Sequence, residues 1–155
     1  MQMNIFKRIY TVMNKNTLLY ILLLAPVWAF GQSGITGTWK TIDDETGEAK
    51  SIVDIYERNG NFYGKIVKLF RNPGQDPDPI CGECPEDDPR YNKKVIGMEI
   101  IKDMKREGDK LVGGTVLKPD EGKIYNCKIW IEDGKLKVRG YWGFFYRTQT
   151  WLRVE

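Results

Sequence analysis

Two cysteines three residues apart form the sharpest chemical feature of the chain. Cys81-Gly82-Glu83-Cys84 has the CxxC spacing that can hold a reactive, low-pKa thiol. That chemistry is usually organised by a helix N-terminus in a βαβ unit, and no such pattern surrounds the motif. The acidic residues Glu83, Glu86 and Asp87 would also disfavour a thiolate, because like charge opposes ionisation.

Two other interpretations of this pair remain. A zinc site shared with Cys127 would have three sulfur ligands. It would lack the fourth ligand of a structural zinc site, since the chain has no histidine to supply it. A local Cys81–Cys84 disulfide needs only an oxidising compartment, and the sequence favours it. Cys127 lies on the apolar face of its expected strand, so we expect a buried free thiol.

Acidic side chains crowd the same region. Their spacing matches no EF-hand loop and the prolines among them stiffen the chain, so we interpret the segment as a solvated loop rather than a calcium site. The acidic residues are Asp76, Asp78, Glu83, Glu86, Asp87 and Asp88.

The absence of histidine restricts catalysis further. It excludes a Ser-His or Cys-His dyad and an imidazole acid–base pair. Carboxylate catalysis would need two facing acids, and Asp54 is the only acid on a plausible inward face of the expected fold. We find no recognisable catalytic constellation, and we expect no metal, no cofactor and no enzymatic activity.

The first residues have the organisation of an export signal. Lys7, Arg8 and Lys15 precede an apolar run that starts at Leu18, and the small residues Ala29 and Gly31 suit a signal peptidase. The run is shorter than the roughly 20 residues of a membrane span, and Pro26 interrupts it. We therefore expect residues 1–31 to be a signal peptide, cleaved after Gly31, and residues 32–155 to form one domain without a membrane span. The expected location is periplasmic or secreted.

Removal of the signal changes the charge balance. The chain has 24 basic and 21 acidic residues, and three of the basic ones lie in the signal, which leaves 21 of each. A domain with no net charge and no basic stripe is unsuited to a phosphate backbone, so we expect no nucleic-acid partner.

The rest of the chain alternates between apolar and polar residues in short runs separated by turn signals. This pattern predicts an all-β domain of about eight antiparallel strands, and closure into an up-and-down barrel would remove the free edges. Only one connection, residues 70–94, is too long to be a plain turn. We therefore expect it to be a functional or mobile loop. The expected strands span residues 36–42, 50–56, 62–69, 96–104, 111–117, 123–131, 135–141 and 148–154.

Alternation also suggests an inner face. Tyr125, Cys127 and Ile129 share one face of their strand, whereas Ile52 and Tyr56 compete with Val53 and Ile55 for the inner face of theirs. A barrel of this size is either filled by its own side chains or holds one small ligand. The tentative ligand-binding residues of the interior are Trp39, Tyr56, Phe62, Tyr125, Ile129 and Trp142.

The two ends of the domain resemble the calycin pattern of lipocalins and their relatives. Gly37-Thr38-Trp39 opens the first strand and Thr150-Trp151-Leu152-Arg153 closes the last. The resemblance implies that Trp39 plugs one barrel end with an arginine, Arg153 or Arg147, stacked on it, while Gly37 belongs to the same closure. It also implies a lipocalin-like fold and ligand binding.

A longer set of motifs resembles the exported bacterial family DUF2147, over essentially all of residues 32–155. That resemblance supports compartment and architecture and implies no reaction. The motifs are Gly37-Thr38-Trp39, residues 52–56, Tyr63-Gly64-Lys65-Ile66, the Cys81/Cys84 pair, Gly113-Gly114-Thr115, Tyr125-x-Cys127 and residues 147–151.

Two functional hypotheses follow. The first is a non-enzymatic barrel that binds a small, largely apolar molecule. The second is a structural or envelope-interaction module that contacts a protein or glycan, for which an exposed Trp130 beside Lys128 and Glu132 would be the central residue.

Overall fold

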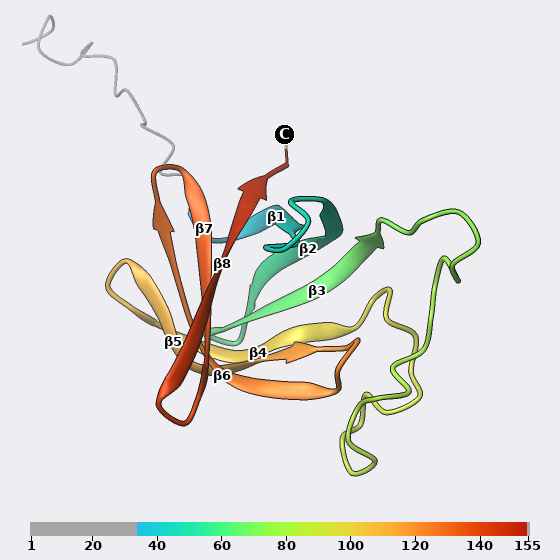
Figure 1. The fold of residues 1–155 in the computed structure, drawn as a ribbon. Helices are drawn as coiled ribbons and strands as arrows, with labels where there is room; N and C mark the ends of the chain where they lie inside the picture. The colour runs from blue at the N-terminus through green and yellow to red at the C-terminus, as the bar shows by residue number, and fades with distance from the viewer. Residues whose placement is uncertain (1–33, 155) are drawn as a thin grey trace, which may run out of the picture. The chain divides into compact units, whose positions relative to one another are not determined.

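The computed structural model describes residues 34–154, so the expected signal peptide lies outside the described residues. Eight antiparallel strands follow one another around a closed barrel, in chain order, and β8 pairs with β1 to complete it (Figure 1). The predicted fold is confirmed, and no helix in residues 34–154 is long and apolar enough to cross a membrane. The strands are β1 (Gly37–Ile42), β2 (Ala49–Arg58), β3 (Asn61–Leu69), β4 (Glu99–Glu107), β5 (Lys110–Lys118), β6 (Lys123–Glu132), β7 (Lys135–Trp142) and β8 (Phe145–Arg153).

Two turns show why the chain reverses where it does. Asn59 and Gly60 join β2 to β3 with φ of 54° and 79°, and Asp133 and Gly134 join β6 to β7 with φ of 51° and 70°. Positive φ at both central residues is the geometry of the type I′ hairpin turn, which Asn-Gly and Asp-Gly favour. The hairpin predicted from Asn-Gly is confirmed.

Two strands begin three residues away from their predicted start. β4 begins at Glu99 rather than Ile96, because Gly97 adopts φ of 89° and donates its N–H to the carbonyl of Ile66. β8 begins at Phe145 rather than Thr148, because only Gly143 and Phe144 are needed to turn the chain after β7. The second difference extends a hairpin whose tip is rich in aromatic residues.

The interior is built from alternate residues of every strand. Val53 and Ile55, not Ile52 and Tyr56, face inward from β2 and are almost completely buried. Small residues allow the strands to approach: a Cβ on Gly114 would lie 2.2 Å from the carbonyl oxygen of Lys102. The fully buried side chains of the barrel are Trp39, Val53, Ile55, Phe62, Ile101, Met104, Leu111, Ile129, Leu136 and Trp151.

The long connection of residues 70–98 forms a second apolar layer outside the barrel (Figure 1). Ile100 and Leu117 point outward from β4 and β5, yet both are buried, together with Val95 and the two cysteines of the loop. The loop has its own backbone hydrogen bonds, including an isolated bridge between Ile80 and Lys94. It is therefore a folded part of the domain.

Candidate functional site

The two ends of the barrel have different constructions. The closed end holds the β2–β3, β4–β5 and β6–β7 turns, and the open end holds the β1–β2, β5–β6 and β7–β8 turns and the long loop. At the closed end the Arg153 guanidinium carbon lies 4.2 Å from the centre of the Trp39 ring. The Trp39 indole donates to the carbonyl of Ile35 at 2.8 Å. A Cβ on Gly37 would lie 3.0 Å from the Arg153 guanidinium, so glycine leaves room for the stack.

The predicted closure therefore has Arg153 as its cation. Arg147 lies near the opposite end of β8, where its Nε is 3.0 Å from a carboxylate oxygen of Asp44 in the β1–β2 turn. A second cation covers the closed end: the Arg106 guanidinium carbon is 4.8 Å from the centre of the Phe62 ring. Aromatic core residues there are shielded from water by arginines stacked on them.

Inward-facing residues become more polar and more exposed toward the open end. Thr41 and Ser51, paired across β1 and β2, share a hydrogen bond of 2.8 Å between their hydroxyl groups. Gln149 accepts a hydrogen bond from the Trp151 indole at 3.2 Å and remains partly exposed. The interior is therefore apolar at its closed end and includes polar groups where it approaches solvent.

Tyr125 and Val116 line the same part of the interior. They are cross-strand partners on β6 and β5, and both are partly exposed although they face inward. A Cβ on Gly140 would lie 3.2 Å from the Cβ of Tyr125 and 3.8 Å from a methyl group of Val116. Gly140 thus provides space on β7 for the tyrosine ring.

The β7–β8 hairpin extends this face beyond the barrel. Trp142 pairs with Phe145 across the two strands, two residues nearer the turn than the pair Gly140 and Arg147. Because side chains alternate along a strand, Trp142 and Phe145 continue the inward-facing side. Each is 75% exposed, Phe144 in the turn is fully exposed, and Tyr146 is 62% exposed. This aromatic tip, defined as Trp142, Phe144, Phe145 and Tyr146, contains the four most exposed large apolar side chains of residues 34–154.

The candidate ligand residues are divided among these regions. Trp39, Phe62 and Ile129 are completely buried in the core of the barrel, Tyr125 lines the interior near the open end, and Trp142 lies at the hairpin tip. The placement of Tyr56 inside the barrel is wrong. Tyr56 points outward because Val53 and Ile55 occupy the inner face of the strand.

Tyr56 instead belongs to a polar cluster on the outer face. Its hydroxyl donates to Glu99 at 2.5 Å, and Arg58 forms an ion pair of 2.8 Å with the same carboxylate. Burial and the Glu99 hydrogen bond raise the pKa of Tyr56 to about 12, and the Arg58 hydrogen bond lowers the pKa of Glu99. Asp54 also faces outward, where it is 3.9 Å from Lys65, so it offers no carboxylate to the interior.

Trp130 lies on the outer face, as predicted, but is only partly exposed. The Arg139 guanidinium carbon is 5.0 Å from its ring centre and 4.4 Å from the ring centre of Tyr146. Arg139 thus lies between two aromatic rings. The prediction of an exposed Trp130 is wrong in this respect, because the arginine covers part of the indole.

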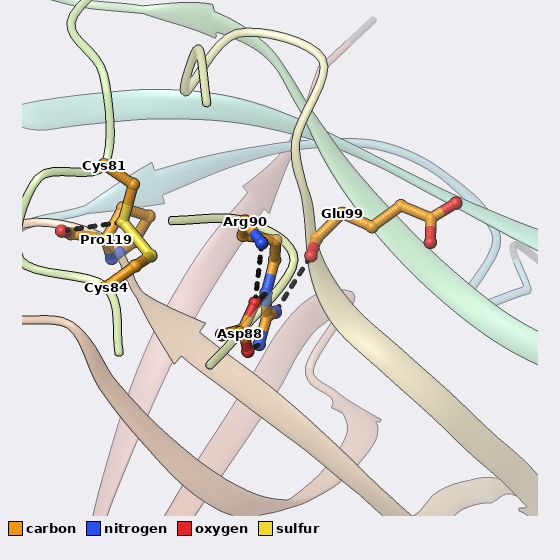
Figure 2. The surroundings of a disulfide bond; sticks show 6 residues. All are labelled: Cys81, Cys84, Asp88, Arg90, Glu99 and Pro119. Carbon is orange, nitrogen blue, oxygen red and sulfur yellow. Dashed lines mark hydrogen bonds and ion pairs between the residues drawn. A yellow bond between two sulfur atoms is a disulfide. The ribbon is translucent and has the colours of Figure 1, made fainter. Parts of the chain in front are cut away.

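A cleft of about 530 Å³ lies between the long loop and β4. Arg90 on its wall is already occupied: it forms a bidentate pair with Asp88 and donates to the carbonyl of Glu99 (Figure 2). The Arg90 hydrogen bonds lower the pKa of Asp88 to about 2. The cleft is lined by Pro89, Arg90, Lys93, Lys94, Ile96, Gly97, Met98, Glu99 and Lys102.

The cysteines are arranged as the sequence favoured. Cys81 and Cys84 form a disulfide, and Cys127 is free and buried, with burial raising the pKa of its thiol to about 12. Both bridged cysteines are nearly inaccessible, and a Cys81 sulfur lies 3.4 Å from the carbonyl oxygen of Pro119 in the β5–β6 turn (Figure 2). Such a bridge suits a structural role better than thiol exchange. Within residues 34–154, no group of three or more Cys, Asp or Glu side chains is arranged to hold a metal ion.

Comparison with protein families places the whole barrel in one group. A family described as an uncharacterized protein conserved in bacteria, DUF2147, matches residues 37–153, from the first residue of β1 to the last of β8. The chain belongs to the DUF2147 family. No curated protein matches the chain.

Among solved structures, the chain is similar to the protein HP1028 from the human pathogen Helicobacter pylori, which is described as belonging to the lipocalin family. The TM-score is 0.65 and the identity 21%, over 77% of this chain and 82% of that one. This likeness shows a lipocalin-like fold for the DUF2147 domain.

Sequence reasoning missed the aromatic tip. The signal was present in Tyr141-Trp142-Gly143-Phe144-Phe145-Tyr146, a glycine flanked on both sides by aromatic residues. A turn with so many large apolar side chains has no room to bury them all. Recognition of a turn at Gly143 would therefore have predicted exposed aromatic rings.

Proposed function

We propose that this protein is an exported binding protein that holds a small, largely apolar molecule at the open end of its barrel. The observation that carries the proposal is that inward-facing side chains there stay partly exposed. Val116, Tyr125 and Gln149 point into the barrel and still reach solvent, whereas inward residues such as Ile129 are completely buried.

The chemistry of these residues suggests the kind of ligand. Val116 and Tyr125 offer apolar area, and Trp142 and Phe145 continue that face outward at the rim. Gln149 and Tyr125 provide polar groups that can orient one end of a ligand. A lipocalin-like barrel is compatible with this use. Trp39, Phe62 and Ile129 are buried in the core below the site and have a structural role.

Dye titration with 1-anilinonaphthalene-8-sulfonate tests the site. Val116→Phe places a larger side chain in the interior and should weaken saturable binding at least about tenfold. Val112→Phe is the matched control, because Val112 is also partly exposed on β5 but faces outward opposite Lys105. If both variants bound the dye with the same affinity as the wild type, the barrel interior would be excluded as the binding site.

Material from the native host tests the ligand and the export separately. Native mass spectrometry should show a bound small molecule that is lost on extraction with organic solvent, whereas an unloaded mass together with no saturable dye binding would refute the proposal. N-terminal sequencing should begin at Gln32. A chain that keeps Met1 would refute export. The dye titration would still test the binding site independently.

A further inference from the structure

We propose that the aromatic tip of the β7–β8 hairpin inserts into the interfacial layer of a phospholipid bilayer with anionic headgroups. This goes beyond ligand binding and does not depend on it. The starting observation is that Trp142, Phe144, Phe145 and Tyr146 are all exposed at one turn (Figure 1, dark red). Contiguous exposed apolar surface is uncommon and marks a contact site.

The chemistry of the tip suits a bilayer interface. Trp and Tyr are enriched at the boundary between headgroups and acyl chains, where an apolar ring and a polar group are both accommodated. Phe144, fully exposed at the end of the turn, has no polar atom in its side chain and would reach deepest. Rings of this size can enter an interface by the roughly 5–10 Å typical of surface-bound segments.

The charge of the hairpin points to anionic headgroups. Arg139 and Arg147 are the basic residues of β7 and β8 nearest the tip, and residues 135–153 contain no acidic residue. Arg139 packs on Tyr146 and has no ion pair within residues 34–154, so it is the free cation beside the tip, whereas Arg147 is already paired with Asp44 and Glu45. Basic side chains beside an apolar insertion strengthen attachment to anionic lipid. The other basic residues of the hairpin, Lys135, Lys137 and Arg153, lie toward the closed end of the barrel.

The other turns of the open end confine the contact to this hairpin. Asp44 and Glu45 in the β1–β2 turn pair with Arg147, and Asp120 and Glu121 in the β5–β6 turn pair with lysines. These acids would be repelled by an anionic surface.

A folded protein partner fits the tip less well. A stable protein interface buries about 800 Å² on each side, with some 20–30 residues. The aromatic tip has only four residues on a narrow turn, and none of them lines the cleft beside the long loop. A shallow insertion needs only the turn itself.

Vesicle binding of residues 32–155 tests the proposal. The wild type should co-sediment with phosphatidylcholine vesicles that contain phosphatidylglycerol, and binding should weaken as salt is raised. Phe144→Asp should reduce the partition at least about tenfold. The matched control is Phe70→Asp, which alters an exposed phenylalanine beyond β3 and should bind as the wild type does.

Fluorescence reports which residue enters the lipid. Trp39 and Trp151 are buried and Trp130 is partly covered, so a blue shift on vesicle addition should come from Trp142. Trp142→Phe should abolish the shift and keep most of the co-sedimentation.

Three results would overturn the proposal: a wild type that stays in solution, a Phe144→Asp variant that binds normally, and a dimer in sedimentation velocity that Phe144→Asp dissociates. The last would assign the tip to self-association. Dye binding at the barrel interior should be unchanged in Phe144→Asp, which separates this test from that of the proposed function.

Discussion

The two ends of the barrel treat aromatic side chains in opposite ways. At the closed end Trp39 is fully buried, with Arg153 stacked on its ring and the Ile35 carbonyl accepting from its indole. At the open end Trp142 is 75% exposed on a hairpin that extends past the barrel. Both tryptophans are on inward-facing positions of their strands. Burial therefore depends on what covers the end of the barrel, and alternation alone does not decide it.

The largest expected effect is at the closed end. Trp39→Ala should lower the free energy of unfolding by about 4 kcal/mol, because it leaves a cavity and an unpartnered carbonyl. Trp142→Ala should change it by less than about 0.5 kcal/mol, because an exposed ring is lost. Urea unfolding measures both. Similar losses for the two variants would contradict the distinction between the ends.

The next effect concerns the contact of the long loop with the β5–β6 turn. A Cβ on Gly122, which has φ of 64°, would lie 1.6 Å from the carbonyl oxygen of Glu83, so Gly122→Ala must displace the loop. We expect a loss of about 3 kcal/mol. Gly134 has φ of 70° and open space around it, so Gly134→Ala at the closed end should lose only about 1 kcal/mol. Thermal unfolding of the two variants provides the comparison.

The Asp88–Arg90 pair should make the loop sensitive to acid. The native pKa of Asp88, about 2, lies below its unfolded value of 3.8, so its contribution is complete above about pH 5 and is lost as pH falls through 4 toward 2. The difference corresponds to about 2 kcal/mol. Unfolding of wild type and Asp88→Asn at pH 7 and pH 3 should show a gap that narrows with acid. A constant gap would mean that the pair contributes nothing through its charge.

The disulfide should have the smallest stabilising effect of the four. It closes a loop of only a few residues, so removing it by replacing Cys81 and Cys84 with Ala should cost about 2 kcal/mol or less and leave the barrel folded. Thiol counting without reductant should find no reactive thiol in the native protein and one, from Cys127, after denaturation. Three thiols in unreduced protein would contradict the bridge.

Much of the fold could be predicted from local pattern. Alternation located all eight strands, and the Asn-Gly turn, the Cys81–Cys84 bridge and the buried Cys127 follow from residue type and spacing. The closure over Trp39 was implied by the resemblance to calycins, and the structure identifies Arg153 rather than Arg147 as its cation. Tyr56 was misplaced because Ile52, Val53 and Ile55 are all apolar, so the strand has no unambiguous period of two. The exposure of Trp130 was misjudged because Arg139, which covers part of its ring, lies on the neighbouring strand, and the local sequence around Trp130 does not show which residue lies across from it.

The sequence by itself determined the strands, the closed sheet and the family, because these depend on periodicity, turn chemistry and residues adjacent in the chain. Only the tertiary structure decided which interior residues reach solvent, where the long loop packs and how far the β7–β8 hairpin extends. Val116 and Ile129 are both apolar residues at inward-facing positions of alternating strands. They differ in exposure because Val116 lies near the open end. Distance from a barrel end is set by strand register around the closed sheet, which no single segment encodes.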